Sequence, residues 1–131
     1  GLKNIHMVDI CAVGDFSPQV PFPEFQARCA DLFGQDVNFA EAFFSESVSR
    51  VGICSGGGSD YAEQCKEAGA DTFVVGELSE NRYHDFSEMP INFVACGHHA
   101  TERFGIQSFG EVLQKQFPET HISFFTEPCP V

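Results

Sequence analysis

The chain has 131 residues, a formal net charge of −12 and six cysteines. A chain of this length fits one α/β domain spanning residues 1–131 and can bury a substantial core. So acidic a surface repels phosphate backbones and anionic lipid headgroups, which argues against a nucleic-acid or membrane partner. No apolar run approaches the roughly 18 residues of a membrane span, and no signal-peptide pattern is visible, so a cytoplasmic location is expected. The cysteines form no CxxC pair and mostly lie in apolar runs, which predicts reduced thiols that pack as small hydrophobic groups. Their even number leaves disulfides as the alternative.

The first 47 residues predict a loose lead-in that contains one helix. Residues 5–13 are apolar with β-branched content and favour a weak strand. The stretch SPQVPFP, residues 17–23, holds three prolines and favours irregular backbone. Apolar residues then recur at helical spacing over 22–33, with a proline near the start and a glycine just after the end, which predicts an amphipathic helix. Residues 37–47 are ambiguous between helix and strand.

From residue 48 onward the pattern becomes regular and predicts a β-α-β-α-β-α-β core over 48–131. The strands are expected at 48–54, 71–76, 90–97 and 121–126, and the helices at 59–69, 79–89 and 98–117. Strands this apolar indicate a mostly parallel or mixed sheet that helices cover on both faces. The last helix carries one apolar face, formed by Ile106, Phe109, Val112, Leu113 and Phe117.

Three of these strands end in polar turns. Cys54 leads into a Gly-rich SGGG turn, Val75 leads into Gly76 and Glu77, and Cys96 leads into Gly97 and two histidines. Ligands of open α/β sheets bind outside the carboxyl ends of the strands, so parallel strands would gather these turns along one rim. The SGGG turn has two interpretations that stay open here, a backbone cradle for an anion and a tight turn that needs unusual dihedral angles.

His98 and Glu102 are separated by four residues at the start of the last predicted helix. At that spacing both side chains project from one face, where an imidazole and a carboxylate are suitable ligands for zinc, manganese or iron. The alternative is a surface His–Glu contact, or His98 as a polar cap. His99 points to another side of the helix, where it is either a supporting hydrogen-bond donor or a group facing solvent.

Glu77 and His84 are the remaining rim candidates. Glu77 follows a buried strand end, as a ligand or general base would, and His84 lies seven residues later on the next predicted helix. Each also fits an ordinary polar residue, so the sequence assigns no catalytic residue.

The rim residues belong to two longer motifs that carry a family resemblance. VGICSGGGSDYAEQCKEAGADTFVVGELSE, followed by FVACGHHATERFGI, resembles the carboxyl-terminal half of the dinuclear metal centre proteins, the YbgI-like family commonly labelled GTP cyclohydrolase 1 type 2 homologues. The similarity is strongest over residues 48–125 and looser over 1–47. It implies one of two related α/β halves that face each other across a cleft holding two divalent metal ions, in subunits that assemble into a toroidal hexamer.

The resemblance implies metal-ligand roles for His98 and Glu102, which match the histidine and glutamate of the family's GH-[HY]-ATE motif. His99 matches a position that can be tyrosine, so no ligand role is carried to it, and Glu77 matches an acidic rim position. The family's remaining ligands, a tandem-histidine motif and an aspartate, lie in an amino-terminal half that this sequence does not contain. That half is the expected partner, and two metal ions per full-length subunit are expected.

The function implied by the resemblance is that of one part of a metal-dependent hydrolase acting on a nucleotide or phosphorylated substrate. The alternative is a non-catalytic metal-binding module, or an oligomeric scaffold or regulatory module, that is inactive as an isolated fragment. If removal of the metal ligands abolishes turnover and leaves the oligomer intact, the protein is part of a hydrolase. Loss of the oligomer on removal of the metal would favour the second.

Overall fold

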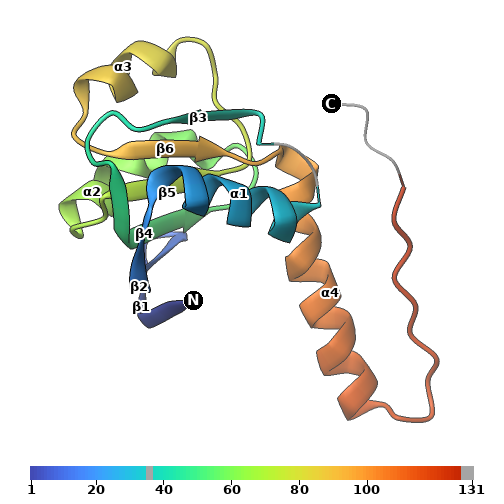
Figure 1. Cartoon of the computed structure of the whole chain (residues 1–131). Helices are drawn as coiled ribbons and strands as arrows, with labels where there is room; N and C mark the ends of the chain where they lie inside the picture. Colours follow the sequence, from blue (N-terminus) through green and yellow to red (C-terminus); the bar gives the residue numbers. More distant parts are fainter. Residues whose placement is uncertain (35–36, 128–131) are drawn as a thin grey trace.

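A computed structural model describes residues 1–34 and 37–127 and shows a mixed six-stranded sheet with helices on both faces (Figure 1). In chain order the elements are β1 (Leu2–Val8), β2 (Cys11–Pro21), α1 (Phe22–Phe33), β3 (Phe39–Glu41), β4 (Ser47–Cys54), η1 (Gly58–Tyr61), α2 (Ala62–Glu67), β5 (Thr72–Val75), α3 (Arg82–Glu88), β6 (Asn92–Ala95) and α4 (His98–Gln116). The α/β fold class with a mixed sheet is therefore confirmed.

The strand order is β1-β2-β4-β5-β6-β3. The central strands β4, β5 and β6 are parallel. β2 and β3 pair antiparallel with β4 and β6, and β1 pairs antiparallel with β2 at the outer edge. Each parallel connection returns through a helix, α2 between β4 and β5 and α3 between β5 and β6. Consequently the carboxyl ends of all three parallel strands lie at the same edge of the sheet.

The amino-terminal region is more regular than its prolines predicted. Leu2–Val8 and Cys11–Pro21 form an antiparallel pair, so the expected irregular stretch at 17–23 is largely strand. Pro18 lies where the pairing between β2 and β4 shifts register, between Asp15 and Val20. A proline is tolerated at such an irregularity because the ladder does not need its missing N–H.

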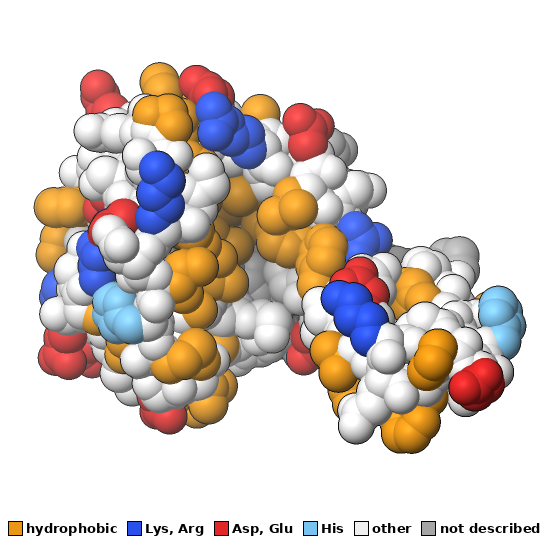
Figure 2. All heavy atoms as spheres, turned by 90° about the horizontal axis from the view of Figure 1, so that it is seen from below, with side chains coloured by type: hydrophobic (Ala, Val, Ile, Leu, Met, Phe, Trp, Pro, Cys, Tyr) orange, Lys and Arg blue, Asp and Glu red, His pale blue; other side chains and the backbone are white. Residues whose placement is uncertain are grey.

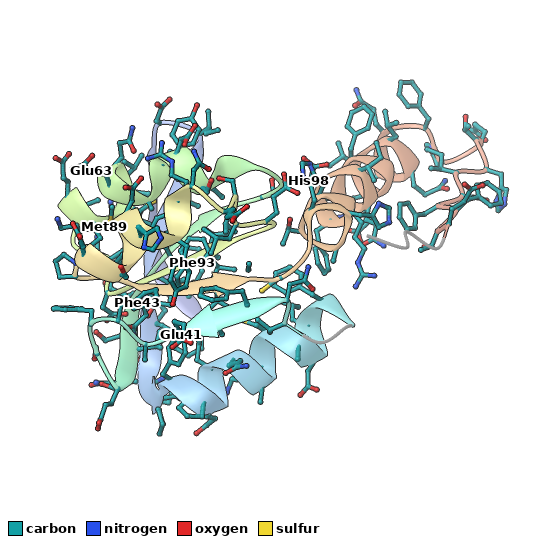
Figure 3. The ribbon with its side chains drawn as sticks, turned by 90° about the horizontal axis from the view of Figure 1, so that it is seen from above. Glu41, Phe43, Glu63, Met89, Phe93 and His98 are labelled. Atoms are coloured by element: carbon teal, nitrogen blue, oxygen red, sulfur yellow. The ribbon has the colours of Figure 1, made fainter. Side chains whose placement is uncertain are left out.

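The sheet buries both faces, and the strand pleat sorts its residues between two helical layers. Phe73 and Phe93 point to one face, while Val74 and Val94 point to the other. The first face is covered from α2 and α3 by Ala62, Cys65 and Phe86. The second is covered by Phe22, Phe25, Cys29 and Phe33 of α1 and by Ala100 from the first turn of α4. Figure 3 shows α1 on one side of the sheet and α2 and α3 on the other.

Beyond its first turn, α4 leaves the sheet and projects from the body, with the following segment running back beside it (Figure 1). Residues 105–127 are called the arm below. The apolar face of α4 is largely exposed, and the strand expected at 121–126 does not form. The physical reason is distance, because nineteen helical residues carry the chain about 28 Å away from its own sheet.

Five cysteines in the described part of the chain are buried and form no disulfide, as predicted for thiols that pack as small apolar groups. Burial raises the pKa of the Cys54 thiol to about 12 and that of Cys11 to about 11, so both remain protonated at neutral pH. The sixth, Cys129, lies outside the described residues. No helix in the described ranges has the length and hydropathy needed to cross a membrane.

Candidate metal centre

The turns after β4, β5 and β6 are hydrogen-bonded to one another, as the parallel arrangement predicted. The Gly76 N–H donates to the Gly56 carbonyl at 3.0 Å, and the Gly97 N–H donates to the Gly76 carbonyl at 2.7 Å. The Glu77 N–H also donates to the Gly56 carbonyl, at 3.2 Å. These bonds fix three turns that are distant in sequence into one continuous rim.

Glycines are needed in this rim because the backbones approach very closely. A Cβ on Gly76 would lie 2.5 Å from the Gly56 carbonyl oxygen. Because that oxygen is a backbone atom, no side-chain rotation could relieve the clash. Gly56 itself has φ of +64°, in the left-handed region that glycine adopts most easily. Its N–H donates to Thr101 Oγ1 at 2.9 Å and is therefore used inside the protein. At Gly56 the structure thus favours the tight-turn interpretation of SGGG over an anion cradle.

Thr101 fixes the start of α4 against the rim. Its hydroxyl lies 3.0 Å from the carbonyls of both Gly97 and His98, in addition to accepting from Gly56. Thr101 and Ala100 are the buried residues of α4. In the next turn Arg103 donates to the Phe33 carbonyl at 2.6 Å and Phe104 packs edge-on against Phe33, so the start of α4 is held on the body. Sequence reasoning overlooked Thr101, although a threonine in the first turn of a predicted helix is a common local hydrogen-bonding signal.

His98 is the first residue of α4 and lies between the body and the arm (Figure 3). Its Nδ1 is 3.1 Å from Glu77 Oε1, and its Nε2 is 3.3 Å from Glu102 Oε1. All three side chains are about half exposed. The hydrogen bond with Glu77 is the largest cause that raises the pKa of His98. Burial acts in the opposite direction, and the negative charges of Glu102 and Glu77 raise the pKa further.

The space occupied by the His98–Glu102 pair exists because residue 56 has no side chain. A Cβ there would lie 2.4 Å from Glu102 Oε1 and 3.0 Å from His98 Nε2. An imidazole nitrogen and a carboxylate oxygen facing each other over a bare backbone turn are a donor pair suited to zinc, manganese or iron. The residues present therefore fit two ligands of a divalent-metal site.

The donor set in this chain is incomplete. Glu77 and Glu102 approach opposite nitrogens of the same imidazole ring, so they do not converge on one point. Among the residues that the structure describes, no group of three or more His, Cys, Asp and Glu side chains is arranged to hold a metal ion. Stable protein metal sites usually have three or four protein ligands, so further donors would have to come from outside these residues.

The other candidate histidines are not part of this cluster. His84 lies on α3, where its ring packs edge-on against Tyr83 with centroids 5.6 Å apart. His99 is exposed on α4 and lines a shallow groove of about 570 Å³ together with Glu102 and Phe124. The contacts that join the three rim turns involve neither residue.

The sheet and the polar cluster at its carboxyl edge define an α/β protein with a His–Glu pair at a helix start. Residues 2–130 match the Duf34/NIF3 (NGG1p interacting factor 3) family, and the chain belongs to it. The resemblance noted around GHHATE is thereby confirmed.

Similar proteins carry a consistent description. A "GTP cyclohydrolase 1 type 2 homolog" from Yersinia pestis is 35% identical over 133 residues, covering 95% of this chain and 53% of the relative. A protein with the same name from Haemophilus influenzae is 44% identical over 70 residues, covering 53% of this chain and 28% of the relative. The chain therefore spans about half the length, or less, of these curated relatives.

Solved structures support the fold. The structure of protein ybgI, described as of unknown function, superposes with a TM-score of 0.88 at 28% identity and covers 98% of this chain and 52% of that one. A protein from Thermus thermophilus superposes with a TM-score of 0.86 at 23% identity, covering 100% of this chain and 52% of its own.

Proposed function

We propose that this chain supplies one wall of a divalent-metal site in a metal-dependent hydrolase, with His98 and Glu102 as its metal ligands. The observation that carries the proposal is the position of His98, whose two ring nitrogens face Glu77 and Glu102 at the rim of the sheet. The name shared by the relatives, GTP cyclohydrolase 1 type 2 homolog, supports a nucleotide or phosphorylated substrate.

The three side chains have distinct tasks in this proposal. Glu77 accepts a hydrogen bond from Nδ1–H, which orients the ring and leaves the lone pair of Nε2 available to a cation. Glu102 contributes a carboxylate from the same helical face one turn later. Thr101 holds the first turn of α4 on the Gly56 turn, so the two ligands keep their spacing relative to Glu77.

A bound divalent cation would supply Lewis acidity toward a phosphoryl or carbonyl oxygen and increase the acidity of water. This chain would orient the cation from one side and leave the opposite side open, because the cluster is half exposed. The open side is where the remaining donors and the substrate would bind. The surface charge of −12 makes a cation important for a phosphorylated substrate, which the protein alone would repel.

The test is a calorimetric titration with zinc or manganese. It is carried out on the parent chain and on two double variants. His98→Ala/Glu102→Ala removes the proposed ligands. His84→Ala/Glu88→Ala is a matched control, since it removes a histidine and a glutamate with the same spacing from α3. We expect weak binding to one site in the parent chain, unchanged in the control and about tenfold weaker or lost in the first variant. Equal binding by all three proteins would contradict the metal-site proposal.

A non-catalytic role for the same site is the second candidate, favoured by the incomplete donor set and by the exposed apolar arm. In that case the metal would hold polypeptides together. The two candidates differ in what metal removal does. Chelation abolishes phosphate-ester or nucleotide hydrolysis at constant molecular mass if the protein is a hydrolase, and it lowers the molecular mass in solution if the metal is structural.

A further inference from the structure

The buried thiols fall into two groups on opposite faces of the sheet. Cys11, Cys54 and Cys65 lie in the layer that α2 and α3 cover. Cys29 and Cys96 lie in the layer that α1 covers. Burial raises the pKa of each thiol in the first group, so these three remain protonated and react poorly with oxidants at neutral pH. The second group differs from the first in its contacts and in its surroundings.

The side chains of Cys29 and Cys96 are hydrogen-bonded to each other. Cys29 lies on the buried face of α1, and Cys96 directly follows β6. The last turn of α1 is fixed beside the start of α4, because Arg103 donates to the Phe33 carbonyl at 2.6 Å and Phe104 packs edge-on against the Phe33 ring. The two sulfur atoms therefore meet in a part of the core where α1 and the end of β6 are already held together.

A cavity beside α1 reaches this pair at Cys29. Its volume is about 260 Å³, and its lining is almost entirely apolar, with Arg28 as the charged side chain. Figure 2 shows hydrophobic side chains gathered on the hollowed side of the body, next to the arm. Cys29 keeps 6% of its surface exposed and Cys96 only 1%, so a small molecule in the cavity meets Cys29 first.

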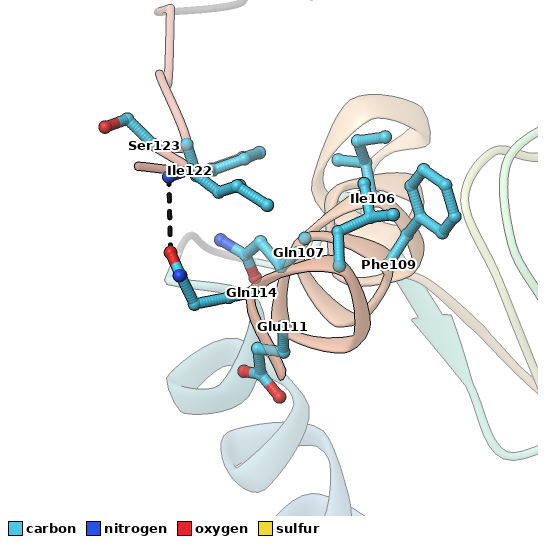
Figure 4. A pocket seen from close by; sticks show the side chains of 10 residues that line it. Ile106, Gln107, Phe109, Glu111, Gln114, Ile122 and Ser123 are labelled. Atoms are coloured by element: carbon cyan, nitrogen blue, oxygen red, sulfur yellow. Dashed lines mark hydrogen bonds between the residues drawn. The ribbon is translucent and has the colours of Figure 1, made fainter. Parts of the chain in front are cut away.

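Two further grooves in the described structure contain no cysteine. One, of about 550 Å³, lies between α4 and the segment after it, where Gln114 accepts a hydrogen bond from the Ile122 N–H at 3.2 Å (Figure 4). The other is the shallow groove beside His99. Of these three hollows, the cavity beside α1 is the one in which a sulfur atom lines the wall.

The two thiols of the pair are not equivalent. The hydrogen bond with Cys96 lowers the pKa of Cys29, although burial opposes this effect. Peroxides react with a thiolate and not with a thiol. Cys29 is therefore the sulfur atom that an oxidant attacks first, and Cys96 lies where it can react with the oxidised product.

We propose that Cys29 and Cys96 form a site of reversible thiol oxidation, at which hydrogen peroxide converts the hydrogen-bonded pair into a disulfide. The Cys29 thiolate attacks one peroxide oxygen and the O–O bond breaks. The leaving hydroxide takes up the proton that Cys29 has lost, which gives water and a sulfenic acid on Cys29. The Cys96 thiol then attacks the sulfenic sulfur, the S–O bond breaks, and the oxygen leaves with the Cys96 proton as a second water. The two electrons that the thiols lose are those that reduce the peroxide.

The cavity favours hydrogen peroxide over larger oxidants. Hydrogen peroxide is small and uncharged, whereas glutathione disulfide is bulky and anionic, and a chain with a net charge of −12 repels it. The cross-link would join α1 to the residue before Gly97, whose N–H donates to the Gly76 carbonyl in the rim. The inference does not depend on whether a metal ion binds at His98.

Peptide mapping by mass spectrometry tests the proposal on the parent chain. The folded chain is treated with a small excess of hydrogen peroxide in a chelating buffer, and the remaining thiols are blocked before digestion with trypsin. Cys29 and Cys96 fall on different peptides because Arg50 and Arg82 lie between them. We expect one linked pair of peptides that is lighter than its parts by two hydrogen atoms and that dithiothreitol separates. Glutathione disulfide at the same concentration should form this link about tenfold more slowly or worse.

Three single variants separate the roles of the thiols. Cys96→Ser removes the second thiol, so the sulfenic acid on Cys29 should persist and be labelled by dimedone. In Cys29→Ser, Cys96 should remain a thiol at the peroxide concentration that oxidises the parent chain. Cys65→Ser is the matched control, since it removes a buried thiol from the other face, and the link should form at an unchanged rate.

The parent chain alone is enough to overturn the proposal. Oxidation of the folded chain first at Cys11, Cys54 or Cys65 would contradict the assignment of the reactive pair. So would the absence of the link under a peroxide excess that oxidises the same thiols in urea. A link that forms equally fast with glutathione disulfide would contradict the role of the cavity.

Discussion

The body and the arm have similar apolar side chains and opposite degrees of burial. In the body, Phe73, Phe86 and Phe93 pack on one another and are almost completely inaccessible. In the arm, Phe109 and Phe125 are mostly accessible. The body buries its aromatic residues because the sheet and its helices provide two facing layers. The arm has one helix and no second layer, so an apolar pattern alone does not determine burial.

The residues of the proposed metal site lie at the boundary between these two regions. The body supplies Glu77 and the Gly56 turn, and the first two turns of α4 supply His98 and Glu102. Thr101 joins the two regions through its bonds to Gly56 and Gly97. The site should therefore be as stable as the body. The remainder of α4 should add little to the stability of the site.

The largest difference between body and arm is expected for aromatic truncation. Phe93→Ala removes a fully buried ring and should lower the free energy of unfolding by about 3–5 kcal/mol, since a cavity remains. Phe109→Ala, in the arm, should change it by less than about 0.5 kcal/mol. Urea unfolding of both variants measures the difference. Equal losses would show that the arm is packed in solution and that the distinction between the two regions is wrong.

Glycine replacement should give effects of opposite sign in the two regions. Gly76→Ala places a Cβ against the Gly56 backbone and should destabilise the protein by about 1–3 kcal/mol. Gly105→Ala meets no atom within 4 Å on the exposed helix and should stabilise α4 by up to about 1 kcal/mol through higher helix propensity. Thermal unfolding and helical circular dichroism test the pair. A stable Gly76→Ala protein would argue against the close packing of the rim turns.

Glu77 should affect metal affinity more than fold stability. Glu77→Gln keeps the size of the side chain but weakens the partner of His98 Nδ1, and we expect about 10–100-fold weaker metal binding. Glu80→Gln removes one charge nearby and serves as the control for the change in net charge. Calorimetric titration with zinc provides the measurement. Equal affinities for the two variants would show that Glu77 does not support the site.

The smallest expected effect is a pH dependence in the presence of chelator. Because Glu77 and Glu102 raise the folded-state pKa of His98 above 6.5, the cluster stabilises the fold fully below pH 6.5 and loses that contribution as pH rises through the raised pKa. The effect is small because the groups are about half exposed. NMR titration should show a His98 pKa above 6.5 that falls toward this value in Glu77→Gln. An unshifted His98 in the parent chain would contradict the observed ion cluster.

Much of the body could be predicted from the sequence. The apolar runs at β4, β5 and β6 are too short and too β-branched for helices, and their polar ends correctly placed the three turns on one rim. Spacing identified His98 and Glu102 as neighbours, and the 3.3 Å between His98 Nε2 and Glu102 Oε1 confirms it. Their role as metal ligands stays a prediction. The contact between His98 and Glu77 depends on the pairing of β5 with β6, which local spacing does not encode.

The prediction failed where local patterns depend on distant context. Prolines suggested a break near Pro18, but a register shift in the sheet accommodates that residue. Within the described residues, 121–126 have strand composition but pair with no strand, and Ile106 and Phe109 on the helical face remain exposed. Among the residues that the structure describes, no surface completes those patterns.

The central claim, that His98 binds a divalent cation through Nε2 while Glu77 holds Nδ1, is tested most directly by NMR of the imidazole nitrogens during titration with zinc. We expect a shift confined to His98, large at Nε2, with the Nδ1 proton retained in its hydrogen bond to Glu77. Perturbation of Nδ1 instead, or of His84 or His99 in place of His98, would contradict the account.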